Sequence, residues 1–257
     1  KSPESTGNEA ERIEQLARLG YLRDYGRALI SPVVGNVKSN NALTIDLGNK
    51  TTISYELGTM RTIGAWTGGY LDFSGTLHHR LRAAGLPIAR FEMINGLEQS
   101  SWAWNGNSNQ KAPNILPKTV WPTSQVRFNG YYPMGNEIII SYAVQNRKVL
   151  EKPSISLINN KRFITRNFTI LGGEKKIDLI YLTRGKAKIT QHTGQIKSPV
   201  AYLESDQKNV LWTSNSDGQL VLQINPTENK ISFNISTAID DLKEDIKKTK
   251  KKTIKQK

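Results

Sequence analysis

Aromatic, glycine and charged residues meet in one short segment that begins at Arg61. Gly68 and Gly69 permit backbone angles that are closed to other residues, so another group can approach the main chain closely. Trp66 offers a flat apolar face beside them, and Asp72 supplies a charge opposite to that of Arg61. This combination suits the corner of a ligand pocket, and it suits a turn in a sheet equally well. The segment predicts a binding face but establishes no reaction.

A second stretch carries three further tryptophans, Trp102, Trp104 and Trp121. In a strand, residues two positions apart point the same way, so Trp102 and Trp104 would present one aromatic platform. Sugar rings stack on such platforms through their C–H faces, and the amides available for the hydroxyl groups are those of Asn105, Asn107, Asn109 and Gln110. Burial is an equal alternative, because tryptophan is a large residue that often closes the end of a core.

Acid–base or metal chemistry has weaker support. His78 and His79 are adjacent, so they point to opposite faces of a strand and lie about 100° apart on a helix, and neither arrangement makes a metal-binding pair. Asp72 is the first candidate for an acid that contacts a ligand, although capping a turn is the simpler role for it. A glycosidase needs two facing carboxyl groups, and the sequence shows no such pair. We expect no metal, and the catalytic residues, if there are any, are unknown.

Several classes of chemistry are excluded by missing motifs. The chain has no cysteine, which removes disulfides, cysteine-ligated zinc, c-type haem attachment and a cysteine nucleophile. It also lacks Gly-x-Ser-x-Gly, a Walker-type loop and a Gly-x-Gly-x-x-Gly fingerprint. We therefore expect no cofactor and no nucleotide-dependent reaction.

Short β-rich runs must position these residues. Strand-like segments separated by Gly, Asn and Pro recur about every 8–12 residues after residue 125, which is typical of a sandwich. The pattern predicts an all-β fold, an antiparallel two-sheet sandwich with a short N-terminal helix near residues 11–22 and a long aromatic loop over 96–122. The candidate strands are Ala42–Leu47, Thr51–Leu57, Thr59–Trp66, Leu71–Phe73, Gln125–Tyr132, Glu137–Gln145, Lys148–Leu150, Arg162–Leu171, Lys176–Tyr181, Lys186–His192, Ala201–Ser205, Asn209–Ser214, Gln219–Ile224 and Lys230–Ser236.

Composition divides the chain into a lead-in with a short helix (1–25), a β-sandwich domain (26–237) and a basic helical or disordered tail (238–257). The formal net charge is +14 over 257 residues, and the tail holds eight Lys from Lys243 onward. A solvated basic tail explains this charge without nucleic acid, while binding of nucleic acid or another anionic polymer through the tail remains an alternative. No apolar run approaches the ~20 residues of a membrane span. Because Lys1 is not an initiator Met, we expect a mature form or an excised piece.

Three segments carry a family resemblance: residues 57–73 with their Trp-Thr-Gly-Gly-x-Leu-Asp string, residues 128–142, and residues 149–153. They resemble the uncharacterised N-terminal β-domain of large bacterial envelope proteins that carry glucose/sorbosone-dehydrogenase-like propeller and c-type cytochrome modules. The resemblance implies an extracytoplasmic location (periplasmic, cell-surface or secreted). It implies no catalytic residues, because the redox modules would lie outside this chain.

Together these features predict a non-catalytic accessory domain that binds carbohydrate or packs against a catalytic partner domain. Its predicted ligand-binding residues are Arg61, Trp66, Gly68, Gly69, Asp72, His78, Trp102, Trp104 and Trp121. The alternative is a polysaccharide-active hydrolase or lyase that uses Asp72 with a His or Tyr.

Overall fold

The chain is built from antiparallel strands. The computed structural model describes residues 26–34, 38–71, 92–94, 97, 100–113, 120–182, 188–189, 193–195, 200–204 and 208–239. Within those residues the one helical element is a single 3₁₀ turn, η2 (Trp104–Gly106). The all-β, antiparallel prediction is therefore confirmed, while the predicted N-terminal helix and most of the basic tail lie outside the described residues. No helix in the described part is long and apolar enough to cross a membrane.

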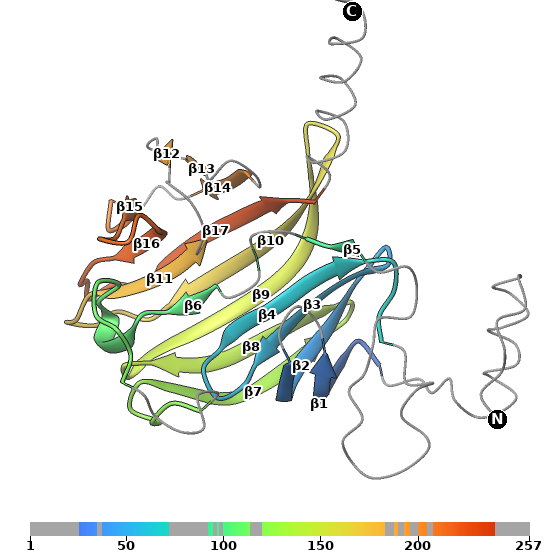
Figure 1. Cartoon of the computed structure of the whole chain (residues 1–257), viewed down its shortest axis with the longest axis horizontal. Helices are drawn as coiled ribbons and strands as arrows, with labels where there is room; N and C mark the ends of the chain where they lie inside the picture. Colours follow the sequence, from blue (N-terminus) through green and yellow to red (C-terminus); the bar gives the residue numbers. More distant parts are fainter. Residues whose placement is uncertain are drawn as a thin grey trace, which may run out of the picture.

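The strands form three sheets (Figure 1). The five-stranded sheet has the order β1-β2-β3-β4-β5 and consists of β1 (Ala28–Val34), β2 (Lys38–Gly48), β3 (Thr51–Glu56), β4 (Arg61–Thr67) and β5 (Glu92–Met93). The four-stranded sheet has the order β15-β16-β11-β6 and consists of β15 (Val210–Ser214), β16 (Leu220–Ile224), β11 (Ile177–Leu182) and β6 (Ser101–Trp102).

The eight-stranded sheet has the order β12-β13-β14-β17-β10-β9-β8-β7. Its long central strands are β17 (Ile231–Ala238), β10 (Lys161–Ile170) and β9 (Arg147–Ile158). The others are β12 (Lys188–Ile189), β13 (Thr193–Gln195), β14 (Val200–Glu204), β8 (Glu137–Val144) and β7 (Val126–Met134), which is one edge of the sheet.

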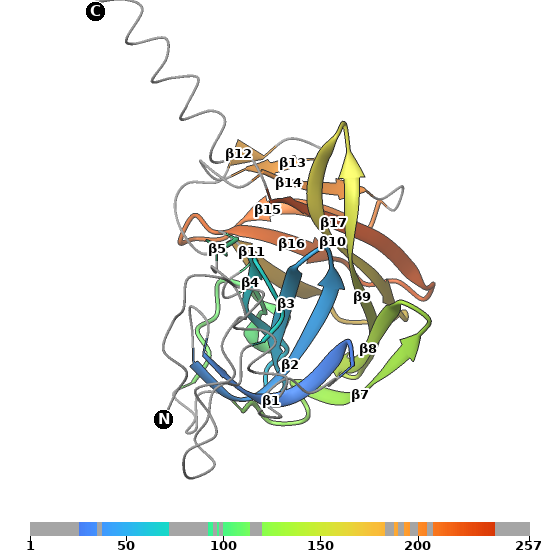
Figure 2. The same ribbon diagram turned by 90° about the vertical axis from the view of Figure 1, so that its right-hand side faces the viewer.

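One hydrophobic core joins the three sheets. It includes Ile53 of β3, Phe168 of β10 and Leu222 of β16, all of them buried. A backbone hydrogen bond of 2.9 Å from the Thr62 N–H to the Ser100 carbonyl also links β4 to the segment that enters β6. Figures 1 and 2 show the five-stranded sheet running alongside β8 and β9. The described residues thus contain three hydrogen-bonded sheets where the sequence predicted two.

Tight hairpins connect several strands at turns that contain asparagine. Asn49 and Lys50 have positive φ angles between β2 and β3, and Asn159 and Asn160 do so between β9 and β10. Two central residues with positive φ make the turn that matches the twist of paired strands, and Asn tolerates this conformation well. Residues 48–50 thus connect β2 and β3 as a tight hairpin.

Strand β9 differs most from its prediction. The sequence predicted only Lys148–Leu150 as a strand in this region. The strand instead runs on to Ile158, since β10 pairs along its length, including a Pro153–Arg166 pair. Strand β1 was not predicted, and Leu71 does not begin the predicted strand 71–73, whose other residues lie outside the described part.

Candidate functional site

The glycine–tryptophan segment is a sheet turn with its aromatic residue inside. Trp66 is fully buried and donates from Nε1 to the Tyr70 carbonyl at 3.1 Å. It belongs to a second core that also holds Val33 and Ile63. The indole of Trp66 thus packs against protein in this structure, and its stacking on a ligand stays a prediction.

The charged and glycine members of that segment are also used internally. Arg61 Nη2 lies 3.0 Å from Oε2 of the buried Glu56. Gly68, whose φ is +119°, donates its N–H to the Lys50 carbonyl at 2.8 Å. The Gly69 carbonyl accepts from the Thr52 hydroxyl at 2.8 Å. Of the two alternatives, the turn is the arrangement observed, while the predicted site residues Asp72 and His78 lie outside the described residues.

The predicted tryptophan platform does not form. Trp102 ends β6 with 1% of its side chain exposed and packs against Tyr142 and Phe168, each with ring centroids 6.3 Å away. Trp104 begins the 3₁₀ turn, so the strand periodicity that would align it with Trp102 is lost. Trp104 instead meets the half-buried Trp121 edge to face, with centroids 5.4 Å apart. The structure brings Trp104 and Trp121 together and separates both from Trp66 and Trp102.

A cluster of ionisable residues lies inside the core. The Glu151 carboxylate accepts hydrogen bonds from Arg166 Nε at 2.6 Å and from the Tyr55 and Tyr142 hydroxyls at 2.7 Å each. All four side chains are buried. Burial, and then the charge of Glu151, raise the pKa of both tyrosines well above the usual value. Because Tyr55 belongs to the five-stranded sheet and the other three residues belong to the eight-stranded sheet, these buried bonds link the two sheets.

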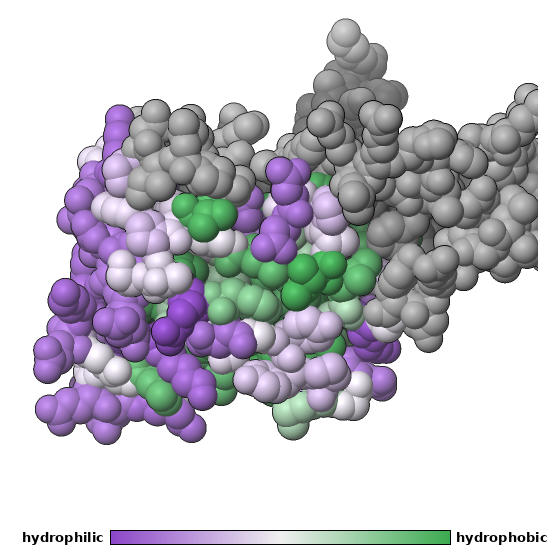
Figure 3. Space-filling view, turned by 90° about the horizontal axis from the view of Figure 1, so that it is seen from below, coloured by the Kyte–Doolittle hydropathy of each residue, from purple (hydrophilic) through white to green (hydrophobic). Residues whose placement is uncertain are grey.

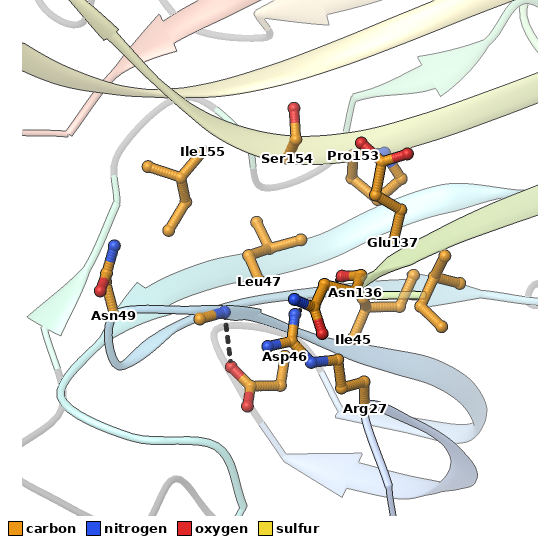
Figure 4. A pocket seen from close by; sticks show the side chains of 12 residues that line it. Arg27, Ile45, Asp46, Leu47, Asn49, Asn136, Glu137, Pro153, Ser154 and Ile155 are labelled. Atoms are coloured by element: carbon orange, nitrogen blue, oxygen red, sulfur yellow. Dashed lines mark hydrogen bonds between the residues drawn. The ribbon is translucent and has the colours of Figure 1, made fainter. Parts of the chain in front are cut away.

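A surface pocket opens where two strands of the eight-stranded sheet separate. Strands β8 and β9 pair only from Val144–Arg147 to Ile140–Glu151, and from Lys152 onward β9 pairs with β10 alone. Pro153 fits this point because it needs no partner for the N–H that it lacks. The β2–β3 hairpin faces the resulting gap, and the cavity between them measures about 370 Å³ (Figure 4). We call this cavity the β8–β9 pocket.

The β8–β9 pocket has an apolar lining and polar groups around it. The apolar lining residues are Ile45, Leu47, Ile138, Pro153 and Ile155. The polar ones are Arg27, Asp46, Asn49, Asn136, Glu137 and Ser154, with Gly48 between them. Figure 4 shows Leu47 and Ile155 on opposite sides of the space, with Asn49 at one end and Asn136 and Glu137 toward the other.

Internal bonds occupy several of the charged groups around the pocket. Arg27 Nη1 donates to the Asn136 carbonyl at 2.7 Å, and the Gly48 N–H donates to Asp46 Oδ1 at 2.8 Å. Glu137 Oε1 accepts from Lys152 Nζ at 2.9 Å. The amide side chains of Asn49 and Asn136 and the Ser154 hydroxyl supply neutral hydrogen-bonding groups. Among the described residues, no three His, Cys, Asp or Glu side chains gather closely enough to hold a metal ion.

Sequence reasoning missed every residue of this pocket. Its members come from the residue before β1, from β2 and the turn after it, from the β7–β8 turn and the start of β8, and from β9, and no ligand-binding residue was predicted in these segments. The one local signal was Pro153, a proline inside a strand-like run. That signal marks a place where a ladder partner is missing, but it does not say what lies opposite.

Comparison with known proteins gives one match. Residues 53–151 match the family model described as a domain of unknown function, DUF6797. No curated protein and no solved structure matches the chain. The matched region runs from β3 into β9 and contains Asn136–Ile138 of the pocket, while Arg27, the β2 residues and Pro153–Ile155 lie outside it. Nothing in the match concerns dehydrogenase or cytochrome modules.

Proposed function

We propose that this chain is a non-catalytic β-sandwich domain that binds carbohydrate in the β8–β9 pocket. In this proposal the five- and four-stranded sheets act as one layer, joined by the Thr62–Ser100 bond, against the eight-stranded sheet. The observation that carries the proposal is the pocket itself, which combines apolar side chains with neutral amide and hydroxyl groups and with the charged Arg27, Asp46 and Glu137. Its volume of about 370 Å³ falls within the range of small-molecule sites.

The chemistry of the lining favours a sugar over a strongly charged ligand. A sugar ring has apolar C–H faces and a rim of hydroxyl groups, so it matches Leu47 and Ile155 on two sides with Asn49 and Asn136 beyond them. Amide groups both donate and accept hydrogen bonds, as hydroxyl groups do. The charged lining residues carry both signs, Arg27 against Asp46 and Glu137, and Glu137 is also paired with Lys152.

The resemblance described above supports an extracytoplasmic accessory role. A domain of this kind would hold a larger envelope protein, or a catalytic partner domain, close to a polysaccharide. Fractionation of the source cells with an antibody against the domain tests the location. Recovery in the cytoplasmic fraction alone would contradict it.

Titration of a panel of mono- and disaccharides by calorimetry tests binding at the pocket. The variant Asn49→Gly removes one amide while preserving the positive φ that position 49 needs, so it should weaken binding about tenfold or more without unfolding. Asn146→Gly is the matched control, because Asn146 is exposed, has a positive φ of 69° and lies outside the pocket. Equal affinities for the three proteins would refute the pocket as the site. Release of reducing ends from the panel would refute the non-catalytic role.

A further inference from the structure

A second surface with groups that suit carbohydrate lies beside the N-terminal end of β7, the end that is remote from the pocket. Trp104 and Trp121 meet there edge to face, and both remain partly exposed. The backbone N–H of Trp121 donates to the Gly58 carbonyl at 3.1 Å, and this bond holds the two tryptophans beside the β3–β4 turn. The two rings lie at 88° to each other, and each keeps part of its surface accessible to solvent.

Amide side chains surround the tryptophan pair and are held in place. The Asn105 N–H donates to Gln125 Oε1 at 3.0 Å, and Gln125 Nε2 donates back to Asn105 Oδ1 at 2.9 Å. Asn105 has a positive φ of 49°, which places it at the tip of the turn. This reciprocal pair is exposed, so its remaining donor and acceptor capacity faces solvent beside the indoles.

Half-buried apolar side chains continue from the tryptophans toward the pocket. Phe128 and Tyr131 of β7 pack against the main core, as Leu47 of the pocket does. A register shift between Phe128 and Gly130 lets both aromatic residues face the same side, since Phe128 pairs with Tyr142 and Tyr131 with Ile140. Figure 1 draws β7 along its lower border, and Figure 3, seen from below that view, shows apolar residues gathered in the middle of the face.

Strand lengths set the distance between the two surfaces. Asn49 of the pocket precedes β3, and Gly58, which binds Trp121, follows it, so the six residues of β3 place the two about 20 Å apart. Strand β7 leads from the Trp121 side to Asn136 through nine residues, or roughly 30 Å. The separation is larger than one or two sugar rings.

We infer that the β8–β9 pocket and the Trp104–Trp121 pair are the two ends of one surface for an extended, unbranched polysaccharide chain. This inference rests on the proposed function and adds the class of ligand, a polymer rather than a free monosaccharide. The pocket holds one ring of the chain, Tyr131 and Phe128 lie beneath the middle, and the tryptophan pair stacks on a further ring. Once one end is bound, the other binds at a high effective concentration.

Calorimetry with xylo-, manno- and cello-oligosaccharides, from disaccharide to octasaccharide, tests the inference. The affinity of the unaltered protein should rise by roughly 10- to 100-fold once the chain is long enough to reach both ends. Trp121→Ala should abolish this gain while leaving disaccharide binding unchanged. Asn105→Gly keeps the backbone conformation and should reduce the gain, whereas Asn159→Gly, at an exposed hairpin position with a similar positive φ, should not.

The outcomes separate the two proposals. If no saccharide of any length binds, the proposed function fails. If disaccharide and octasaccharide bind equally, or if the Asn105→Gly protein keeps the full gain at an unchanged Tm, the extended surface is refuted while the pocket stands. If Trp121→Ala melts at a lower temperature, its lost gain could come from unfolding, and the test then rests on the other two variants. A reduced gain for Asn105→Gly with a full gain for Asn159→Gly supports the extended surface, and equal gains refute it.

Discussion

Arg166 and Glu151 form an ion pair inside the core, with 2.6 Å between Nε and Oε1 and with both side chains almost completely buried. The guanidinium also stacks on Phe168, with 4.9 Å between its Cζ and the ring centroid, and donates from Nη1 to the Ser100 hydroxyl at 3.1 Å. Arg166 Nη2 has no hydrogen-bond partner among the described residues. Since Tyr55 reaches Glu151 from the five-stranded sheet, the pair joins two sheets as well as two strands.

Replacing one partner should be costly. Glu151→Gln leaves the Arg166 charge buried without its counterion, and we expect a loss of about 3–5 kcal/mol in the free energy of unfolding. Urea denaturation measures this loss. Glu137→Gln is the control, because the Glu137–Lys152 pair is exposed and its removal should change stability by no more than about 1 kcal/mol. Equal losses in the two variants would contradict a special role for the buried pair.

The free energy of unfolding should fall at alkaline pH because of two buried tyrosines. Burial, followed by the charge of Glu151, raises the pKa of Tyr55 and Tyr142, so the folded protein keeps protons that the unfolded chain releases near pH 10. The folded state then binds more protons than the unfolded state above that pH, and the free energy of unfolding falls as pH rises. The stability that the two tyrosines contribute is fully present below about pH 10. Above that pH, the free energy of unfolding declines by up to about 1.4 kcal/mol per pH unit for each tyrosine.

Urea titrations between pH 8 and pH 11 on Tyr55→Phe and Tyr142→Phe test this slope. Each variant loses one hydrogen bond to Glu151, which should lower stability by about 1–3 kcal/mol at pH 8. Each should also decline less steeply above pH 10, because one suppressed ionisation is gone. Slopes identical to that of the unaltered protein would show that these tyrosines do ionise in the folded state.

Trp102→Ala should act on stability. The indole packs on Tyr142 and Phe168 in the core, so its removal leaves a cavity and should cost about 3–5 kcal/mol. Thermal unfolding followed by circular dichroism measures the change in Tm. Unaltered stability would return Trp102 to the ligand-binding role that the sequence predicted for it.

Gly106 should tolerate no side chain. Its φ is +67°, and an added Cβ would lie 2.3 Å from the Lys176 carbonyl oxygen, so Gly106→Ala combines backbone strain with a clash. Gly218 has a similar φ of +74° but open space around it, so Gly218→Ala reports the strain alone, about 1 kcal/mol. We expect the Gly106 variant to be clearly less stable by urea denaturation. Equal losses would show that the η2 turn moves freely away from Lys176.

Local patterns predicted most of the strands. Runs such as 137–145, 162–171 and 219–224 match β8, β10 and β16 to within a residue, because alternation and turn residues are properties of neighbouring positions. The same reasoning failed at β9, where it predicted only Lys148–Leu150. The strand continues to Ile158 because it pairs with β10, and the local sequence of β9 does not contain that pairing.

Packing between the sheets determines which aromatic side chains are exposed to solvent. Trp102 and Trp104 have the same residue type and nearly the same sequence context, yet one is buried and the other begins a partly exposed turn. The difference arises because β6 pairs with β11 only at Ser101 and Trp102. No property of the local sequence contains that pairing.

Residue types and short-range spacing were enough to predict the all-β class and to exclude cysteine chemistry, and asparagine marks the hairpin turns at Asn49 and Asn159. The position of the pocket depends on tertiary packing. That pocket exists because β8 leaves β9 after the Ile140–Glu151 pair and the β2–β3 hairpin closes over the gap. Segments about a hundred positions apart meet there, and their meeting depends on the packing of whole sheets.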